Sequence, residues 1–87
     1  MQIHHAIITD EQSSFRIVAV PGVVMADQTQ AEGTARFLQA RLTELPLALV
    51  TRNAQGAPAA YYGRGDLVVR LLRVPAGEVR WDVLPLS

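Results

Sequence analysis

The chain has 87 residues with equal numbers of acidic and basic side chains, no cysteine, and an apolar content that is mostly aliphatic. The absence of cysteine excludes disulfides, thiolate zinc sites and a cysteine nucleophile. The zero formal charge excludes a strong general attraction for nucleic acid, so nucleic acid is not expected as a partner. The length is that of one domain, and residues 1–87 are expected to form a single small domain.

The composition also bears on location and assembly. The first residues, MQIHHAIITDEQ, lack the basic start and long apolar run of an export signal, and no run has membrane-spanning length. We therefore expect a cytoplasmic protein with no membrane partner. All eight basic residues are arginine, which is typical of a GC-rich genome and favours a bacterial source. A chain this short buries a modest core, so a homodimer is expected.

The N-terminal part of the chain predicts a β-hairpin. Residues 2–9 and 15–20 read as strands, because they alternate and hold every isoleucine of the chain. The polar run 10–14 between them is short, which favours antiparallel pairing. Pro21 and Gly22 then break the second strand.

The main helix is predicted over residues 29–45. Thr29 and Glu32 have the spacing of a capping box, which makes Thr29 the preferred N-cap over Asp27. The helix is expected to end before Pro46, because the residue that precedes proline is pushed out of helical geometry. Spacings of three and four define its apolar stripe: Ala31, Ala35, Leu38, Leu42 and Leu45.

The C-terminal half predicts three more strands, at 47–51, 57–62 and 78–84. The first two are joined by a polar turn that ends at Gly56, and Pro58 suits an edge strand or a strand terminus. The last strand alternates cleanly between apolar and charged residues.

The segment 66–74 fits two structures. As a helix capped by Asp66, it places Asp66, Arg70 and Arg73 in one polar arc and its aliphatic residues on the remainder. As a strand, it would place Arg73 among leucines and valines. The helix is preferred. The predicted fold is therefore α+β, with a mainly antiparallel sheet of four to five strands, one main helix on one face and a short second helix, in the order β-β-α-β-β-α-β.

No catalytic, metal or cofactor residues are predicted. His4 and His5 are adjacent on a strand and so point to opposite faces, which prevents them from holding one ion together. The serines lie in a loop or at the end of the chain, and the paired carboxylates Asp10 and Glu11 lie in a solvated turn. The sequence therefore favours a protein without catalytic activity, although it does not decide the question.

A weak anion-binding pattern precedes the second helix. Gly63 and Gly65 could expose backbone N–H groups, with Arg64, Arg70 and Arg73 nearby. This pattern supports the alternative function, a small anion- or ligand-binding protein or enzyme that uses the Gly63–Asp66 connection. A plain strand-to-helix connection explains the same glycines.

The preferred function is a non-catalytic interaction or accessory module that self-associates. Phe37 lies off the apolar stripe, beside Arg41 on the helical wheel, so it is either covered by another segment or exposed at an interface. Trp81 on the last strand is a second anchor candidate, although such a residue also suits the core. The predicted interface is a sheet edge or the Phe37 flank, with a second copy or an unidentified protein as the partner.

Overall fold

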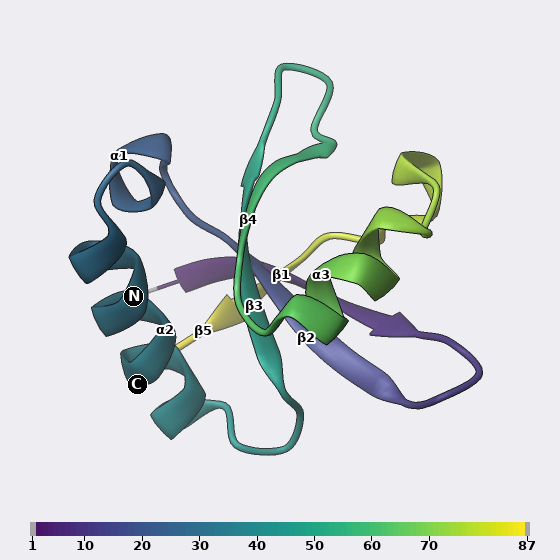
Figure 1. Cartoon of the computed structure of the whole chain (residues 1–87), viewed down its shortest axis with the longest axis horizontal. Helices are drawn as coiled ribbons and strands as arrows, with labels where there is room; N and C mark the ends of the chain where they lie inside the picture. Colours follow the sequence, from purple (N-terminus) through teal and green to yellow (C-terminus); the bar gives the residue numbers. More distant parts are fainter. Residues whose placement is uncertain (1, 87) are drawn as a thin grey trace.

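The computed structural model describes residues 2–86 and contains a mixed five-stranded sheet with helices on both faces (Figure 1). The predicted order β-β-α-β-β-α-β is confirmed, with two short helices added to it. The elements in chain order are β1 (Gln2–Thr9), β2 (Ser14–Ala19), α1 (Gly22–Met25), α2 (Gln28–Arg41), β3 (Leu47–Arg52), β4 (Pro58–Tyr62), α3 (Gly65–Leu72), the 3₁₀ turn η1 (Ala76–Glu78) and β5 (Asp82–Pro85).

The sheet is mainly antiparallel, as predicted, but it contains one parallel pair. Its strand order is β4-β3-β2-β1-β5. β1 pairs antiparallel with both β2 and β5, and β3 pairs antiparallel with β4. β2 and β3 run parallel, since the chain between them crosses over through α1 and α2. The carboxyl ends of β2 and β3 therefore meet at one edge of the sheet.

The start of α2 corrects the predicted cap. Asp27 is the N-cap, and its Oδ1 accepts hydrogen bonds from the backbone N–H of Thr29 at 2.8 Å and of Gln30 at 3.4 Å. The preference for Thr29 was wrong because Asp27 has the extended backbone of a cap residue, while Thr29 already lies inside the helix.

The end of α2 is four residues earlier than predicted. The side-chain amide of Gln39 donates to the carbonyl oxygens of Leu42 and Leu45 at 2.8 and 2.9 Å. These bonds stabilise an irregular chain after Arg41, so the helix does not continue to Pro46. Pro46 marks the last position at which the helix could end, but the helix ends earlier, at Arg41.

The second helix is confirmed as α3, and the strand alternative for this segment is wrong. Two details differ from the prediction. Arg64 occupies the N-cap position without a side-chain cap bond, and Asp66 lies in the first turn. Arg70 is buried with only 8% of its surface exposed, so it does not belong to a solvated polar arc.

The last strand is shorter than predicted. β5 comprises residues 82–85, whereas Val79 and Trp81 precede it in an irregular segment and pack against the core. Their alternation reflects two side chains turned toward the core and not a paired strand. The short helix α1 follows the break that was predicted at Pro21 and Gly22, but the helix itself was not predicted.

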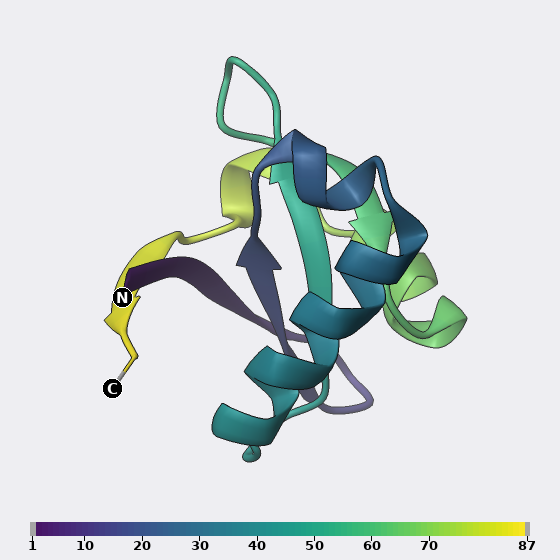
Figure 2. The same cartoon turned by 90° about the vertical axis from the view of Figure 1, so that its left-hand side faces the viewer.

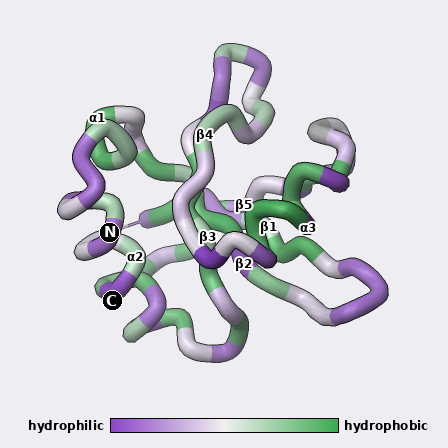
Figure 3. The backbone as a smooth tube through the Cα atoms, in the orientation of Figure 1, coloured by the Kyte–Doolittle hydropathy of each residue, from purple (hydrophilic) through white to green (hydrophobic). Residues whose placement is uncertain are grey.

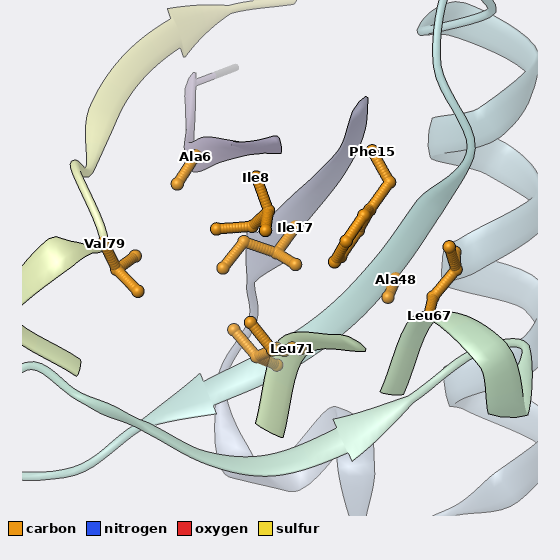
Figure 4. Packing of buried hydrophobic residues seen from close by; sticks show 9 residues of the cluster. Ala6, Ile8, Phe15, Ile17, Ala48, Leu67, Leu71 and Val79 are labelled. Atoms are coloured by element: carbon orange, nitrogen blue, oxygen red, sulfur yellow. The ribbon is translucent and has the colours of Figure 1, made fainter. Parts of the chain in front are cut away.

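Two apolar clusters lie on opposite sides of the sheet, in agreement with the alternation of the strands. The cluster under α3 comprises Ala6, Ile8, Phe15, Ile17, Ala48, Val50, Leu67, Leu71 and Val79 (Figure 4). The cluster under α2 comprises Ile3, Val18, Ala31, Leu38, Leu42, Leu47 and Leu49. Figure 3 shows α3 as the more hydrophobic of the two helices, while the hairpin loops are hydrophilic. Within residues 2–86, no helix has the length and apolar character needed to cross a bilayer.

Candidate functional site

The predicted anion-binding connection begins with a glycine that is needed for packing. Gly63 has a φ of 156°, and a Cβ at this position would lie 3.0 Å from the Cβ of Ala48. The connection therefore passes too close to β3 for a larger residue. This contact accounts for Gly63 without a ligand.

Arg64 is already paired with a carboxylate of its own segment. Its Nε and Nη2 donate to the two carboxylate oxygens of Asp66 at 3.0 and 2.7 Å. The Arg64 guanidinium lowers the pKa of Asp66 from its ordinary value. An anion at Gly65 would have to compete with this pair, which lies at the surface.

Arg70 is held more completely. Its Nε and Nη2 donate to Asp10 at 2.6 and 2.8 Å, and Nη2 also donates to the carbonyl oxygen of Ser13 at 2.8 Å. The guanidinium also lies 4.9 Å from the centre of the Phe15 ring. Hydrogen bonds from Arg70, with further ones from backbone N–H groups of the turn, hold the pKa of Asp10 well below its ordinary value. Arg70 thus ties α3 to the β1–β2 turn.

The third arginine of the predicted site, Arg73, stays exposed at a shallow cavity of about 360 Å³. Asp10 and Glu11 also line this cavity, and both carry negative charge. The structure therefore brings Arg70 and Arg73 to one cavity but supplies acidic groups with them, and it engages Arg64 elsewhere.

The predicted interface residues Phe37 and Arg41 are adjacent on α2. Phe37 is 42% exposed, and the Arg41 guanidinium lies 3.7 Å from the centre of its ring. Beside Phe37 lies a recess of about 250 Å³ whose walls come from α2, α1, the first residues of β1 and the last residues of β2, including Ile3 and Val24. Phe37 is therefore a half-exposed aromatic at the rim of an apolar depression.

The sheet beside Phe37 is uncovered. In Figure 2, α2 lies in front of β3, whereas β1 and β5 extend to the left with no described helix in front of them. Ile7 on this side of β1 is 44% exposed. We call this surface the open face. Its residues, all on the α2 side of the sheet, are His5, Ile7, Asp82, Leu84, Phe37 and Arg41.

Polar groups on the α2 side of the sheet are incompletely paired. His5 Nδ1 and Arg16 Nε are buried and lack a hydrogen-bond partner among the described residues. Arg16 reaches Glu44 at 3.7 Å, and Glu44 is largely exposed. Burial and the positive charge of Arg16 lower the pKa of His5, while Asp82 opposes them. His5 is thus favoured in its neutral form.

The two adjacent histidines point to opposite sides, as predicted. His4 pairs in register with Ala19, which packs against the α3-side cluster, and His5 pairs with Val18 of the α2-side cluster. Within residues 2–86, no group of three histidine or carboxylate side chains is arranged to hold a metal ion.

Trp81, the other predicted anchor, is half-buried against the α3-side cluster. Its Nε1 donates to the carbonyl oxygen of Gly56 at 3.1 Å, and its ring lies 5.1 Å from the guanidinium of Arg52. The indole therefore connects the C-terminal segment to the β3–β4 turn.

Sequence reasoning did not find one further cleft. This cleft, of about 710 Å³, lies at the carboxyl ends of β2 and β3, between the β3–β4 turn and α1. Figure 1 shows both of these segments projecting at the same end of the sheet. Arg52 lines it together with His4, and Arg52 Nη2 donates to His4 Nδ1 at 3.2 Å. These two residues are far apart in sequence, and only the pairing of β1, β2 and β3 brings them together.

These features define a small α+β protein with a mixed sheet, the helices α2 and α3 on its opposite faces, and two accessible surfaces, the open face and the cleft. Comparisons with protein-family models, with curated proteins and with solved structures give no match for this chain. Functional inference therefore rests on the geometry alone.

Proposed function

We propose that this protein is a non-catalytic, cytoplasmic interaction module that forms a homodimer through its open face. The observation that carries the proposal is the exposure of Phe37 and Ile7 on the same uncovered side of the sheet. Exposed apolar groups that gather on a small domain usually mark a partner site. The lack of cysteine fits a reducing compartment.

A second copy suits this face because the face is self-complementary. A two-fold dimer brings the same patch of both copies together, so each projection needs a depression in the same patch. Phe37 is the projection and the adjacent recess lined by Ile3 and Val24 is the depression. Both signs of charge are also present, on Arg41 and Asp82, so antiparallel patches can pair opposite charges.

A dimer interface of ordinary size would cover a modest part of this chain. A stable interface buries roughly 800 Å² on each partner, which is a small share of the 5342 Å² of accessible surface on this chain. Burial of further apolar surface would also supplement a core that the sheet divides into two modest clusters.

Light scattering during gel filtration tests the proposal, with the protein loaded at about 10 to 500 µM. We expect a dimer for the natural sequence and a folded monomer for Phe37→Glu, because an isolated carboxylate would be buried at the interface. The monomer itself should lose no more than about 1 kcal/mol, the scale of the exposed cation–π contact with Arg41.

The matched control is Val69→Glu. Val69 is 50% exposed on α3, on the opposite side of the sheet, so this variant introduces the same charge at a similar exposure. It should remain dimeric. A natural protein that is monomeric at 500 µM, or a dimer that survives Phe37→Glu and is lost in Val69→Glu, contradicts the proposal.

A further inference from the structure

We infer that the cleft at the carboxyl ends of β2 and β3 binds a small organic oxyanion, a phosphate or carboxylate compound, through Arg52. In open sheets with parallel strands, ligands commonly bind outside the carboxyl ends of those strands. β2 and β3 are the parallel pair of this sheet, and the cleft lies at their ends. Its volume of about 710 Å³ falls within the range of small-molecule sites.

Arg52 is the charged group of this cleft, and it has no counter-charge. Within residues 2–86 it forms no ion pair, in contrast to Arg16, Arg36, Arg64 and Arg70. Its contacts are the ring nitrogen of His4 and the face of Trp81, which orient the guanidinium without neutralising it. An oriented and uncompensated guanidinium is suited to bidentate recognition of an oxyanion.

The acceptor groups around Arg52 are already occupied. Asn53 Oδ1 accepts from the backbone N–H of Gln55 and of Ala57, which leaves its side-chain amide nitrogen as the available group. The carbonyl oxygens of Asn53 and Gly56 accept from the Gly56 N–H and from Trp81, respectively. The polar side chains that remain at the cleft are therefore mainly donors.

His4 also presents a donor. Arginine can only donate, so His4 Nδ1 is the acceptor in the bond to Arg52. The proton of the neutral imidazole then lies on Nε2, which is the nitrogen left for a ligand. The residues that line the cleft include no aspartate or glutamate. Donors without carboxylates favour an anionic, acceptor-rich ligand.

The opposite end of the sheet shows what a compensated arginine site looks like. The cavity at Arg70 and Arg73 contains Asp10 and Glu11, and Asp10 already takes two hydrogen bonds from Arg70. An added anion would meet negative charge there. The predicted anion-binding function is thus better supported at Arg52 than at the Gly63–Asp66 connection.

The test uses the fluorescence of Trp81, the only tryptophan in the chain, which lies 5.1 Å from Arg52. The protein is titrated with glycerol 3-phosphate and with succinate at constant ionic strength, and with glycerol as the uncharged control. We expect a saturable change with at least one oxyanion and none with glycerol. The oxyanion with the lower Kd identifies the charged group of the ligand.

A thermal-shift measurement provides the second readout, because a substitution at Arg52 also alters the surroundings of Trp81. Ligand at ten times its Kd should raise the Tm by about 6 to 11 °C. Arg52→Gln should weaken binding at least about tenfold, the scale of one charge-assisted hydrogen bond. Arg52→Lys should bind at an intermediate level, since lysine keeps the charge and loses the fork.

The matched control is Arg73→Gln, which removes an exposed arginine from the other cavity and should bind like the natural protein. Phe37→Glu should also bind normally, so that failure of the dimer and failure of this site are distinguishable. The inference is overturned if neither oxyanion gives a saturable response, if Arg52→Gln binds as well as the natural sequence, or if Arg73→Gln is the variant that loses binding.

Discussion

The two sides of the sheet are covered to different extents, although the main helix lies on the less covered side. α3 has only eight residues, yet Leu67 and Leu71 are almost fully buried, and Val79 extends the cover toward β1. α2 has fourteen residues, but it packs over β2 and β3 and leaves much of β1 open. The position of a helix across the sheet therefore decides what remains exposed, more than its length does.

The two sides also differ in how completely their buried arginines are hydrogen-bonded. On the α3 side, Arg70 is buried, and its Nε and Nη2 donate hydrogen bonds to Asp10 and Ser13. On the α2 side, Arg16 is as buried but has an unpaired Nε and a long contact with Glu44. The covered side has satisfied its polar groups within the chain. The open side has not, which is what we expect of a surface that another molecule completes.

The largest effect is expected on the covered side. Leu67→Ala should lower the free energy of unfolding by about 2 to 5 kcal/mol, because it leaves a cavity in a closed cluster. Leu72→Ala in the same helix should change it by about 0.5 kcal/mol or less, since Leu72 is 62% exposed. Urea unfolding at a protein concentration below the dimer Kd measures both.

Phe37→Ala measures how much the open face contributes to the free energy of unfolding of the monomer. We expect a loss of about 1 kcal/mol in the monomer, which is closer to Leu72→Ala than to Leu67→Ala. A loss as large as that of Leu67→Ala would mean that Phe37 is a core residue, and the comparison between the two sides would no longer hold.

The second effect concerns the ion pair that closes the α3 side. Since Arg70 lowers the pKa of Asp10 in the folded state, the carboxylate contributes stability above its ordinary pKa and loses it as the pH falls toward the folded value. The natural protein should therefore lose stability steeply below about pH 4. Asp10→Asn should be less stable at pH 7 and much less sensitive to acid.

Urea unfolding at pH 7, 5, 4 and 3 measures this dependence. Glu11→Gln is the matched control, because Glu11 is the next residue and forms no ion pair within residues 2–86. It should keep the acid dependence of the natural protein. Equal acid sensitivity in Asp10→Asn and the natural protein would show that the pair with Arg70 does not hold α3 in solution.

Local patterns predicted the order of the elements but not the way they meet. The apolar stripe of α2 is a short-range signal that is confirmed at Ala31 and Leu38, whereas Leu45 lies beyond the end of the helix. The alternation of β1 and β2 is confirmed in the division of their apolar residues between the two clusters. The extent of an element depends on contacts with distant or irregular neighbours. Gln39 ends α2 through bonds to carbonyls beyond it, and no periodicity reveals such bonds. The same limit applies to the last strand, because Val79 and Trp81 face the core without a strand partner.

The candidate sites show this limit more strongly. The sequence placed Phe37 off the stripe of α2, which is a property of one helix, and the structure shows it half-exposed. The pairing of Asp10 with Arg70 and of His4 with Arg52 joins residues that are 60 and 48 positions apart in the sequence. Arg52 appeared in the sequence as one scattered arginine among eight. Its significance depends on the parallel pairing of β2 with β3. This pairing could not be predicted from short loops, which indicate antiparallel neighbours only.

The smallest effect distinguishes how the two helices begin. α3 begins without a side-chain cap, so its stability depends on the burial of Leu67 and Leu71. α2 is less buried and begins with Asp27, whose carboxylate accepts from two backbone N–H groups. Asp27→Ala should therefore cost about 1 kcal/mol, and Thr29→Ala about 0.5 kcal/mol or less. Urea unfolding gives the totals, and hydrogen exchange at Thr29 and Gln30 localises the change to the first turn. If Thr29→Ala costs more stability than Asp27→Ala, the N-cap of α2 is Thr29 and not Asp27. The contrast between a helix stabilised by its cap on the open side and a helix stabilised by burial on the covered side would then be weaker.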